Sequence, residues 1–352
     1  MTLKPSIAAI EPYLPGQNMN GAVKLSSNEN PLGPSPKAVR SIQKALDNIH
    51  RYPDGSATAL RVKLAELWKL NSDRLIITNG SDEFFTLLAA AFIGQGENAL
   101  SVRETFSQYR FAVRLFGAEI RESSLIEGRY NLDGMLRLVN KKTRLVFVCN
   151  PNNPTGCYST HREITAFLRS IRKDIIVVLD EAYADFADKP DFPDARALLD
   201  EFPNLVVTRT FSKLYGLAGL RVGYAMGNAE VIAGARRASM PFNVNRLAQI
   251  AAGAALEDAE HREKTLKLVH EERNYLSGEL KSRGIFHYPT QANFLCFDLK
   301  TETAKLWDAI AFRGIVLRDL KSFDLPHMAR YTIGTRKNNR RLVEILDEIN
   351  LK

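Results

Sequence analysis

Between about residue 70 and residue 240, short apolar runs alternate with amphipathic helical patterns, and this alternation constrains the fold more than any other feature. The runs are RLIIT, NALSV, TRLVFVC, DIIVVL and NLVVTRT. They are rich in β-branched residues and show no polar alternation, which is typical of strands buried on both faces. Strands that alternate with helices form a mostly parallel sheet with helices on both sides. We therefore predict an α/β fold for this region.

The pattern changes after Pro241. A long charged helix is predicted at about 258–284, followed by a strand in ANFLCFDL, a helix, strands in IVLRDL and ARYTIGT, and a last helix at 337–350. A chain of 352 residues usually divides into two domains. We predict an N-terminal arm at 1–40 that packs with the small domain, a large domain at 41–244, and a small α+β domain at 245–352.

The charge and the cysteine content limit the classes of protein to which this chain can belong. The net charge is +8, but the basic residues are scattered among acids, which favours a solvated surface over a nucleic-acid patch. The three cysteines, Cys149, Cys157 and Cys296, form no C-x-x-C pair, which fits a reducing cytoplasm and argues against a metal site. Neither a signal peptide nor an 18-residue apolar run is present, so we expect a cytoplasmic protein without a membrane or nucleic-acid partner.

Polar groups follow four of the predicted strands where each strand ends. They are the segments NGSDE (79–83), NPNNPTG (150–156), DEAY (180–183) and the pair Ser212-Lys213. In open α/β sheets, ligands bind outside the carboxyl ends of the strands. We therefore expect these four groups to converge on one crevice.

Each group alone has an ordinary structural explanation. Ser81 and Asp82 suit a helix N-cap as well as a phosphate site at a helix N-terminus. Asp180 can cap a loop or pair with an arginine, or it can bind a cationic ligand group. Lys213 can form a buried salt bridge, or it can serve as a nucleophilic amine.

Together the groups fit one ligand, pyridoxal phosphate (PLP), whose enzymes use a Schiff-base lysine and an acidic partner for the pyridine nitrogen. Ser81, Ser212 and Arg221 could bind the phosphate of PLP, and Lys213 could react with its carbonyl group. Asp180 could pair with its ring nitrogen, and Asn153 and Tyr183 could bind its ring hydroxyl.

Along nearly its whole length the chain resembles the fold-type-I PLP-dependent aminotransferases of the class II subgroup, and within them the histidinol-phosphate aminotransferases. The segments that carry the resemblance are KLSSNENPLGPSP, RYPDG, NGSDE, NPNNPTG, DEAY, TFSKLYGLAGLRVGY, PFNVN and RYTIGTR, in this order. The resemblance implies the aspartate-aminotransferase-like fold, with a large domain, a smaller α+β domain and an N-terminal arm. One departure is Glu104, where the family commonly has proline.

The resemblance also implies roles for single residues. Lys213 would bind PLP covalently and then move the proton between substrate and cofactor, while Asp180 would pair with the pyridine nitrogen. Tyr109 would stack on the ring, and Asn153 and Tyr183 would bind its oxygen. The phosphate would be surrounded by Ser81, Asp82, Thr210, Ser212 and Arg221.

Three further roles concern the substrate and the assembly. Tyr52 would reach the phosphate of a neighbouring subunit, which implies a homodimer. Arg318 and Arg330 would bind the substrate's phosphate or carboxylate, and Tyr13 would add a hydroxyl to the same anion. The substrates would be a small amino donor and a 2-oxo acid.

The implied reaction transfers the amino group of L-histidinol phosphate to 2-oxoglutarate. Alternatives within the fold are an aromatic amino-acid aminotransferase and a PLP-dependent threonine-phosphate decarboxylase. A PLP-binding transcription regulator is disfavoured, because the segment before the first motif is too short for a DNA-binding domain.

Overall fold

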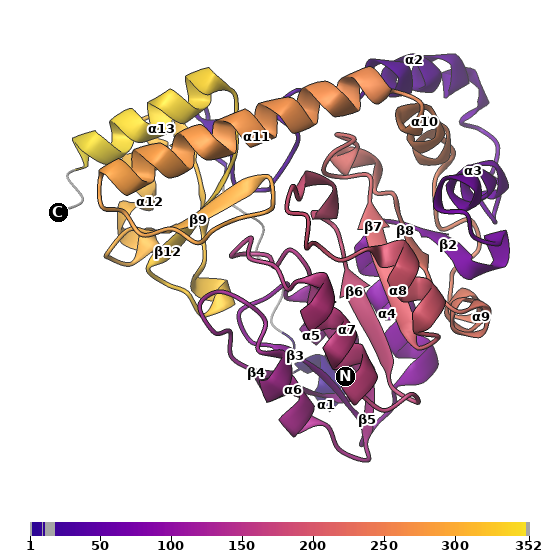
Figure 1. The fold of residues 1–352 in the computed structure, drawn as a ribbon. Coiled ribbons are helices and arrows are strands. Elements are labelled where there is room, and N and C mark those ends of the chain that lie inside the picture. Colours follow the sequence, from indigo (N-terminus) through magenta and orange to yellow (C-terminus); the bar gives the residue numbers. More distant parts are fainter. Residues whose placement is uncertain (1, 9, 11–17, 350–352) are drawn as a thin grey trace.

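The computed structural model describes residues 2–8, 10 and 18–349, which fold around a seven-stranded sheet and a smaller second part (Figure 1). The large sheet has the strand order β2-β8-β7-β6-β5-β3-β4. Its strands are β2 (Leu75–Thr78), β3 (Asn98–Val102), β4 (Glu119–Ser123), β5 (Thr143–Cys149), β6 (Ile176–Asp180), β7 (Leu205–Thr210) and β8 (Gly223–Met226).

Six of these strands run parallel, and β8 runs antiparallel to both of its neighbours, β2 and β7. The five strands predicted between residues 70 and 210 are confirmed. Strands β4 and β8 were not predicted. Strand β4 lies at one edge of the sheet, and its residues are half-buried or exposed, so it lacks the continuous apolar run of its neighbours.

Helices accompany the strands in the order that the alternation predicts. In Figure 1, α7 and α8 lie in front of the sheet and α4 lies behind it. The helices before and within this part are α1 (Pro5–Ala8), α2 (Pro36–Ala45), α3 (Thr58–Trp68), α4 (Ser81–Phe92), α5 (Gln108–Leu115), α6 (Leu132–Leu138), α7 (His161–Ser170), α8 (Ala195–Glu201), α9 (Ala229–Arg237) and α10 (Arg246–Leu256).

The second part contains two small sheets. Strand β12 pairs antiparallel with both β11 and β9, and β1, from the N-terminal segment, pairs parallel with β10. A long helix, α11, runs across the top of the molecule and links this part to the region of α2 and α10 (Figure 1). The elements are β1 (Val23–Lys24), α11 (Ala259–Ser282), β9 (Phe294–Asp298), α12 (Thr303–Ala311), β10 (Ile315–Val316), β11 (Arg318–Asp319), β12 (Met328–Thr332) and α13 (Arg336–Glu348).

Two main groups of buried apolar side chains hold the chain together. One surrounds the large sheet, and it includes Ala248, Ala251 and Ala252 of α10. The other lies among α11, α13 and the small sheets, and it also takes in Tyr183 and Leu214. Helix α10 therefore belongs to the same core as the large sheet, although the predicted boundary at 244/245 assigns it to the small domain.

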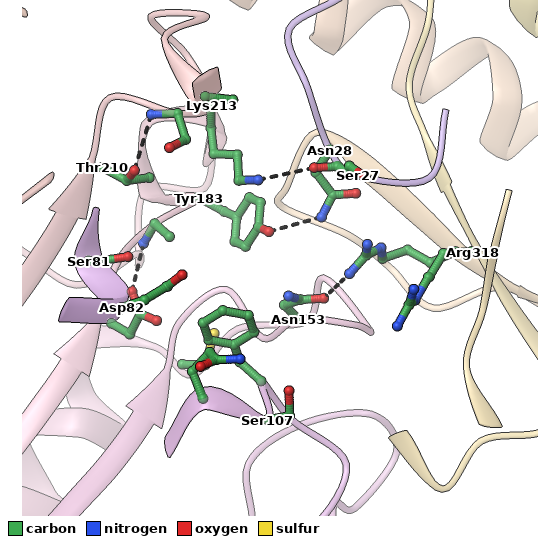
Figure 2. A pocket seen from close by; sticks show the side chains of 18 of the residues that line it. Ser27, Asn28, Ser81, Asp82, Ser107, Asn153, Tyr183, Thr210, Lys213 and Arg318 are labelled. Atoms are coloured by element: carbon green, nitrogen blue, oxygen red, sulfur yellow. Dashed lines mark hydrogen bonds between the residues drawn. The ribbon is translucent and has the colours of Figure 1, made fainter. Parts of the chain in front are cut away.

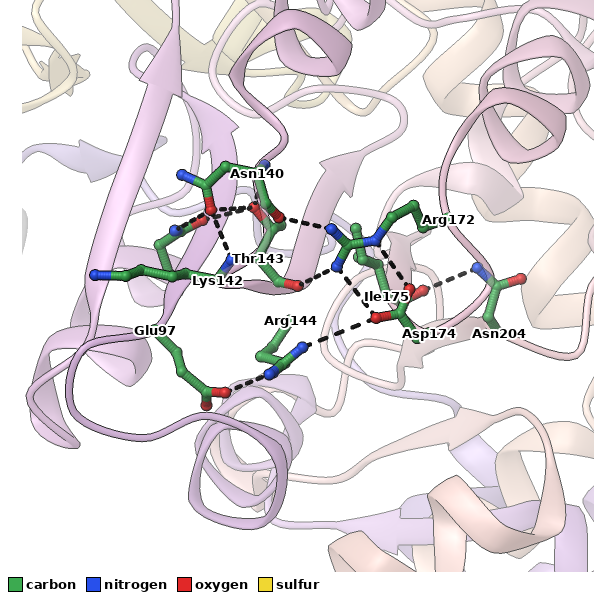
Figure 3. A network of polar contacts seen from close by, with 10 residues as sticks. Glu97, Asn140, Lys142, Thr143, Arg144, Arg172, Asp174, Ile175 and Asn204 are labelled. Atoms are coloured by element: carbon green, nitrogen blue, oxygen red, sulfur yellow. Dashed lines mark hydrogen bonds and ion pairs between the residues drawn. The ribbon is translucent and has the colours of Figure 1, made fainter.

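A network of polar contacts links the loops at the amino ends of the central strands (Figure 3). Arg172 donates to Asp174 (3.0 Å) and to the carbonyl of Asn140 (2.9 Å), and Arg144 donates to Glu97 (2.5 Å). These bonds fix the loops at that edge of the sheet. The opposite edge, at the carboxyl ends, is where the polar segments predicted from the sequence lie. Within the part of the chain that the structure describes, no helix is both long and apolar enough to cross a membrane.

Candidate active site

Strand register brings the carboxyl ends of the central strands to one place. Cys149 of β5 lies opposite Asp180 of β6, and Asp180 lies opposite Thr208 of β7. Gly223 of β8 lies between Thr210 of β7 and Thr78 of β2. A cavity of about 930 Å³ opens at this edge (Figure 2), as predicted from the groups that follow the strands.

Most of the predicted site residues line this cavity. They are Ser81, Asp82, Asn153, Asp180, Tyr183, Thr210, Ser212, Lys213, Arg221, Arg318 and Arg330. Tyr13 lies outside the described residues. Tyr52 and Tyr109 are described, but neither is among the residues that line the cavity.

One end of the cavity is suited to an anion. Helix α4 begins there at Ser81, and the free N–H groups and dipole of a helix N-terminus attract negative charge. The Arg221 guanidinium lies over this terminus, 3.4 Å from a carboxylate oxygen of Asp82 and 3.4 Å from the hydroxyl of Ser212. A side chain at Gly80 would meet it, because a Cβ there would lie 2.6 Å from Arg221 Nη2. Glycine at 80 therefore keeps the anion site open to the guanidinium.

Lys213 extends from the loop after β7 into the middle of the cavity (Figure 2). Its Nζ donates a hydrogen bond to the carbonyl oxygen of Ser27 (3.1 Å). Burial, followed by the nearby positive charge of Arg330, lowers the pKa of the Lys213 amine to about 8. A much larger share of the amine is therefore neutral near neutral pH than for an exposed lysine, as a nucleophilic lysine requires.

Asp180 ends β6 beneath the cavity and is only 2% exposed. Its Oδ1 accepts hydrogen bonds from the Thr208 hydroxyl (3.0 Å) and the Ala182 N–H (3.2 Å), and its Oδ2 accepts one from Tyr109 (2.5 Å). Burial raises the pKa of this carboxyl to about 6, while the hydrogen bonds from Tyr109 and Thr208 hold it down. Asp180 is therefore mainly ionised at neutral pH and can stabilise a cationic ligand group.

The predicted ring-stacking position of Tyr109 does not agree with the structure. Tyr109 lies on the inward face of α5, where it is fully buried, and its ring stacks on Phe147 with centroids 4.9 Å apart. Phe106, three residues earlier in the turn before α5, lines the cavity instead and packs edge-on against Tyr109. Residue type alone does not show which of the two aromatic residues faces the cavity. Position in the sequence is the more useful signal, because Phe106 precedes the helix and so stays near the strand end.

The wall opposite the sheet comes from the N-terminal segment and from β12. Asn28 lines the cavity and donates a hydrogen bond from Nδ2 to the hydroxyl of Tyr183 (2.9 Å). Asn153 Oδ1 accepts a hydrogen bond from Arg330, which also donates to the carbonyl of Ser26 (2.8 Å). The segment KLSSNENPLGPSP carries part of the family resemblance, but its pattern predicts no role for Asn28.

Two arginines stand side by side on the small-sheet wall. Arg318 of β11 is the cross-strand partner of Arg330 on β12, and both line the cavity. Guanidinium groups bind carboxylate and phosphate oxygens in a bidentate manner. This wall is therefore suited to an anion, and the predicted role of the two arginines in binding the substrate stays a prediction.

Tyr52 lies at the surface and is 78% exposed, with its ring stacked on Phe242 at 4.7 Å. Among the described residues, it does not contribute to the cavity of its own chain. This position is compatible with the predicted role in a neighbouring subunit, a role that stays a prediction.

The donor set of the cavity fits PLP. The start of α4 with Arg221 suits its phosphate, the Lys213 amine suits its carbonyl carbon, and the buried Asp180 carboxylate suits its ring nitrogen. The amide of Asn153 and the hydroxyl of Tyr183 suit its ring oxygen. Each chemical group of the cofactor thus has a partner of the right kind.

Comparisons with known proteins agree with this chemistry. The family model for aminotransferase class I and II matches residues 20–346. A histidinol-phosphate aminotransferase of Symbiobacterium thermophilum is 40% identical over 98% of this chain and 98% of its own length. One of Anaeromyxobacter sp. is also 40% identical, with the same coverage of both chains.

Solved structures show the same fold. The histidinol-phosphate aminotransferase of Sinorhizobium meliloti, in complex with pyridoxal-5'-phosphate, superposes with a TM-score of 0.90 at 24% identity and covers 99% of this chain and 98% of its own. The match of the family model and the 40% identity of the curated relatives both extend over almost the whole chain. This chain therefore belongs to the class I and II aminotransferases and is a PLP-dependent enzyme with the aspartate-aminotransferase-like fold.

Proposed function

We propose that the protein transfers the amino group of L-histidinol phosphate to 2-oxoglutarate, giving imidazole-acetol phosphate and glutamate. The observation that carries the proposal is the pair Arg318 and Arg330 on the wall of the cavity that also holds Lys213. This donor has a phosphate and no α-carboxylate, so its recognition requires cations placed away from the cofactor's own phosphate site. The names and the 40% identity of the curated relatives support the same substrate.

PLP, when bound, supplies a conjugated ring that takes up the electron pair left on the α-carbon of the substrate. The residues of this chain prepare and use that ring. The Lys213 amine, with its pKa of about 8, acts as the nucleophile and then carries the proton from the α-carbon. Asp180 keeps the ring nitrogen protonated through its buried carboxylate, which Tyr109 and Thr208 hold in place.

The remaining contacts hold the cofactor. Ser81, at the start of α4, and the guanidinium of Arg221 bind the phosphate, with Ser212 and Thr210 adding hydroxyl groups at the same end. Phe106 provides an aromatic wall for the ring. Asp82 pairs with Arg221 and so orders the loop around the phosphate.

The arginine pair also accounts for two dissimilar donors. Arg330 and Arg318 can bind the phosphate of histidinol phosphate in one half-reaction and the carboxylates of glutamate in the other. Hydrogen bonds from Arg330 to Asn153 and to the carbonyl of Ser26 orient its guanidinium group at the cavity. Tyr13, outside the described residues, adds a hydroxyl to the same anion in this proposal.

The working form in this proposal is a cytoplasmic homodimer. The exposed ring of Tyr52 and the adjoining Phe242 support a partner subunit, because Tyr52 is available to a neighbour's phosphate site and not to its own. The three described cysteines are all unpaired, which agrees with a reducing compartment.

Amino-donor specificity tests the function. The purified protein with added PLP is incubated with 2-oxoglutarate and either histidinol phosphate, phenylalanine or tyrosine, and glutamate formation is measured. We expect the highest kcat/KM with histidinol phosphate and no turnover in the control variant Lys213→Ala. Efficient turnover of phenylalanine with none of histidinol phosphate would establish the aromatic aminotransferase instead. Release of CO2 from threonine phosphate would establish the decarboxylase.

A further inference from the structure

Asn28 occupies an unusual place in the site. Its backbone adopts the left-handed conformation, with φ of 57°, and its side chain lines the cavity although the residue is only 1% exposed. Asparagine tolerates this conformation better than most residues, and glycine tolerates it best. The position is therefore fixed by tertiary contacts and not by local sequence alone.

Three hydrogen bonds anchor Asn28 to the small sheets. Its backbone N–H donates to Thr332 Oγ1 (2.8 Å), and its carbonyl oxygen accepts from Asn293 Nδ2 (3.1 Å). The hydroxyl of Thr332 in turn donates to Asn28 Oδ1 (3.4 Å). A backbone N–H can only donate, so the Thr332 oxygen must accept there, and its hydrogen is free to point at Oδ1. In this arrangement the amide oxygen of Asn28 faces Thr332 and the amide nitrogen faces Tyr183.

The orientation of this amide decides the role of Tyr183. With Oδ1 bound to Thr332, the Asn28 NH2 group faces Tyr183 and donates to its hydroxyl oxygen at 2.9 Å. A phenol has one hydrogen, and here its oxygen already accepts. The hydrogen of Tyr183 is therefore left to donate to another acceptor, and Tyr183 lines the cavity where the cofactor's ring oxygen is expected (Figure 2).

We propose that Asn28 is a positioning residue, which makes the Tyr183 hydroxyl a hydrogen-bond donor to the ring oxygen of the cofactor. The inference rests on the proposed role of Tyr183. It also ties that role to the substrate wall, because Thr332 follows Arg330 by two residues on β12. The strand that binds the substrate anion and the tyrosine that binds the cofactor are thus joined through one asparagine.

The test is a pH titration of the visible absorbance of the PLP-loaded protein, which reports the protonation of the bound cofactor without any turnover. A hydrogen bond donated to the ring oxygen stabilises its deprotonated form, so losing the donor moves the midpoint to higher pH. Asn28→Gly keeps the left-handed backbone and removes the amide. Asn28→Asp keeps the shape of the side chain, but a carboxylate can only accept hydrogen bonds, so the Tyr183 hydroxyl would donate its hydrogen to the new carboxylate instead of to the cofactor. We expect Asn28→Asp to raise the midpoint by about half to one unit, the equivalent of one hydrogen bond, and Asn28→Gly, which only leaves the Tyr183 hydroxyl free to rotate, to raise it by less.

A matched control and a double-mutant cycle separate the outcomes. Asn30→Asp makes the same change two residues away, where the amide bonds to the carbonyl of Leu214 and not to Tyr183, and it should leave the midpoint in place. In a Tyr183→Phe background, Asn28→Gly should cause no additional shift. An unchanged midpoint in both Asn28 variants, or an equal shift in Asn30→Asp, would overturn the inference.

Tyr183→Phe by itself distinguishes this inference from the proposed function. If that variant shifts the midpoint and the Asn28 variants do not, the relay is wrong and the role of Tyr183 stands. If Tyr183→Phe leaves the midpoint unchanged, the role of Tyr183 and the inference fall together. The amino-donor assay decides the reaction in either case.

Discussion

Replacing Tyr109 by phenylalanine should change the pH at which the apo-protein binds PLP. Tyr109 donates to the buried carboxylate of Asp180 at 2.5 Å, and Asp180 has a pKa raised to about 6 by burial. A hydrogen bond to a charged group contributes about 1.5–3 kcal/mol, or about one to two pH units. Its loss should therefore raise the pKa of Asp180 from about 6 to roughly 7–8.

The direction follows from the form of Asp180 that is required. Only the carboxylate stabilises a protonated pyridine nitrogen, so PLP affinity falls as the pH drops through the pKa of Asp180. The wild type should lose affinity below about pH 6. The Tyr109→Phe variant should lose it below roughly pH 7–8, with affinity weaker by about two- to tenfold at pH 7 and equal to the wild type at pH 9.

The measurement is the dissociation constant of PLP for the apo-protein across this pH range, followed by quenching of protein fluorescence. Tyr130→Phe is the matched control, since it also removes a buried hydroxyl, which contacts Thr105 (2.9 Å). The control should keep the wild-type midpoint. An unchanged midpoint in Tyr109→Phe, or an equal shift in Tyr130→Phe, would refute the reasoning.

Three further outcomes are expected. Borohydride should fix PLP to Lys213 in the wild type, whereas Lys213→Ala should still bind the cofactor through the phosphate contacts but lose transamination, and wild-type turnover in that variant would contradict the assignment. Arg330→Ala should lower kcat/KM for both histidinol phosphate and glutamate by a few kcal/mol of transition-state stabilisation, and a change within about threefold for both would show that the anion site lies elsewhere. If Tyr52 completes the neighbour's site, mixing Tyr52→Phe and Lys213→Ala subunits should restore activity beyond the sum of the two, and a fully active monomer would rule this out.

Much of the large sheet follows from local sequence. Strands β2, β3, β5, β6 and β7 were predictable because each is a continuous apolar run that helices bury on both faces. Strand β8 was not, since GYAM is short, follows a glycine-rich loop, and is buried only because it inserts antiparallel between β2 and β7. The placement of α10 depends in the same way on its alanines packing against the large-sheet core.

The residues of the site likewise fall into those that the sequence could predict and those that it could not. Lys213, Asp180 and Arg221 could be predicted because they directly follow apolar runs or lie in a motif, and parallel strands place such residues at one edge. Phe106 and Tyr109 lie three residues apart, and the structure shows that Phe106 lines the cavity while Tyr109 donates a hydrogen bond to Asp180 from the protein interior.

The sequence by itself determined the chemistry of this protein: the types of group, their order along the chain and the strand ends that carry them. The tertiary structure decided which groups touch. Asn28 and Thr332 are separated by 304 positions, yet their hydrogen bonds set the orientation of the Asn28 amide and through it that of Tyr183. No local pattern encodes such a contact, because a side-chain hydrogen bond extends only about 3 Å and depends on how two distant segments pack.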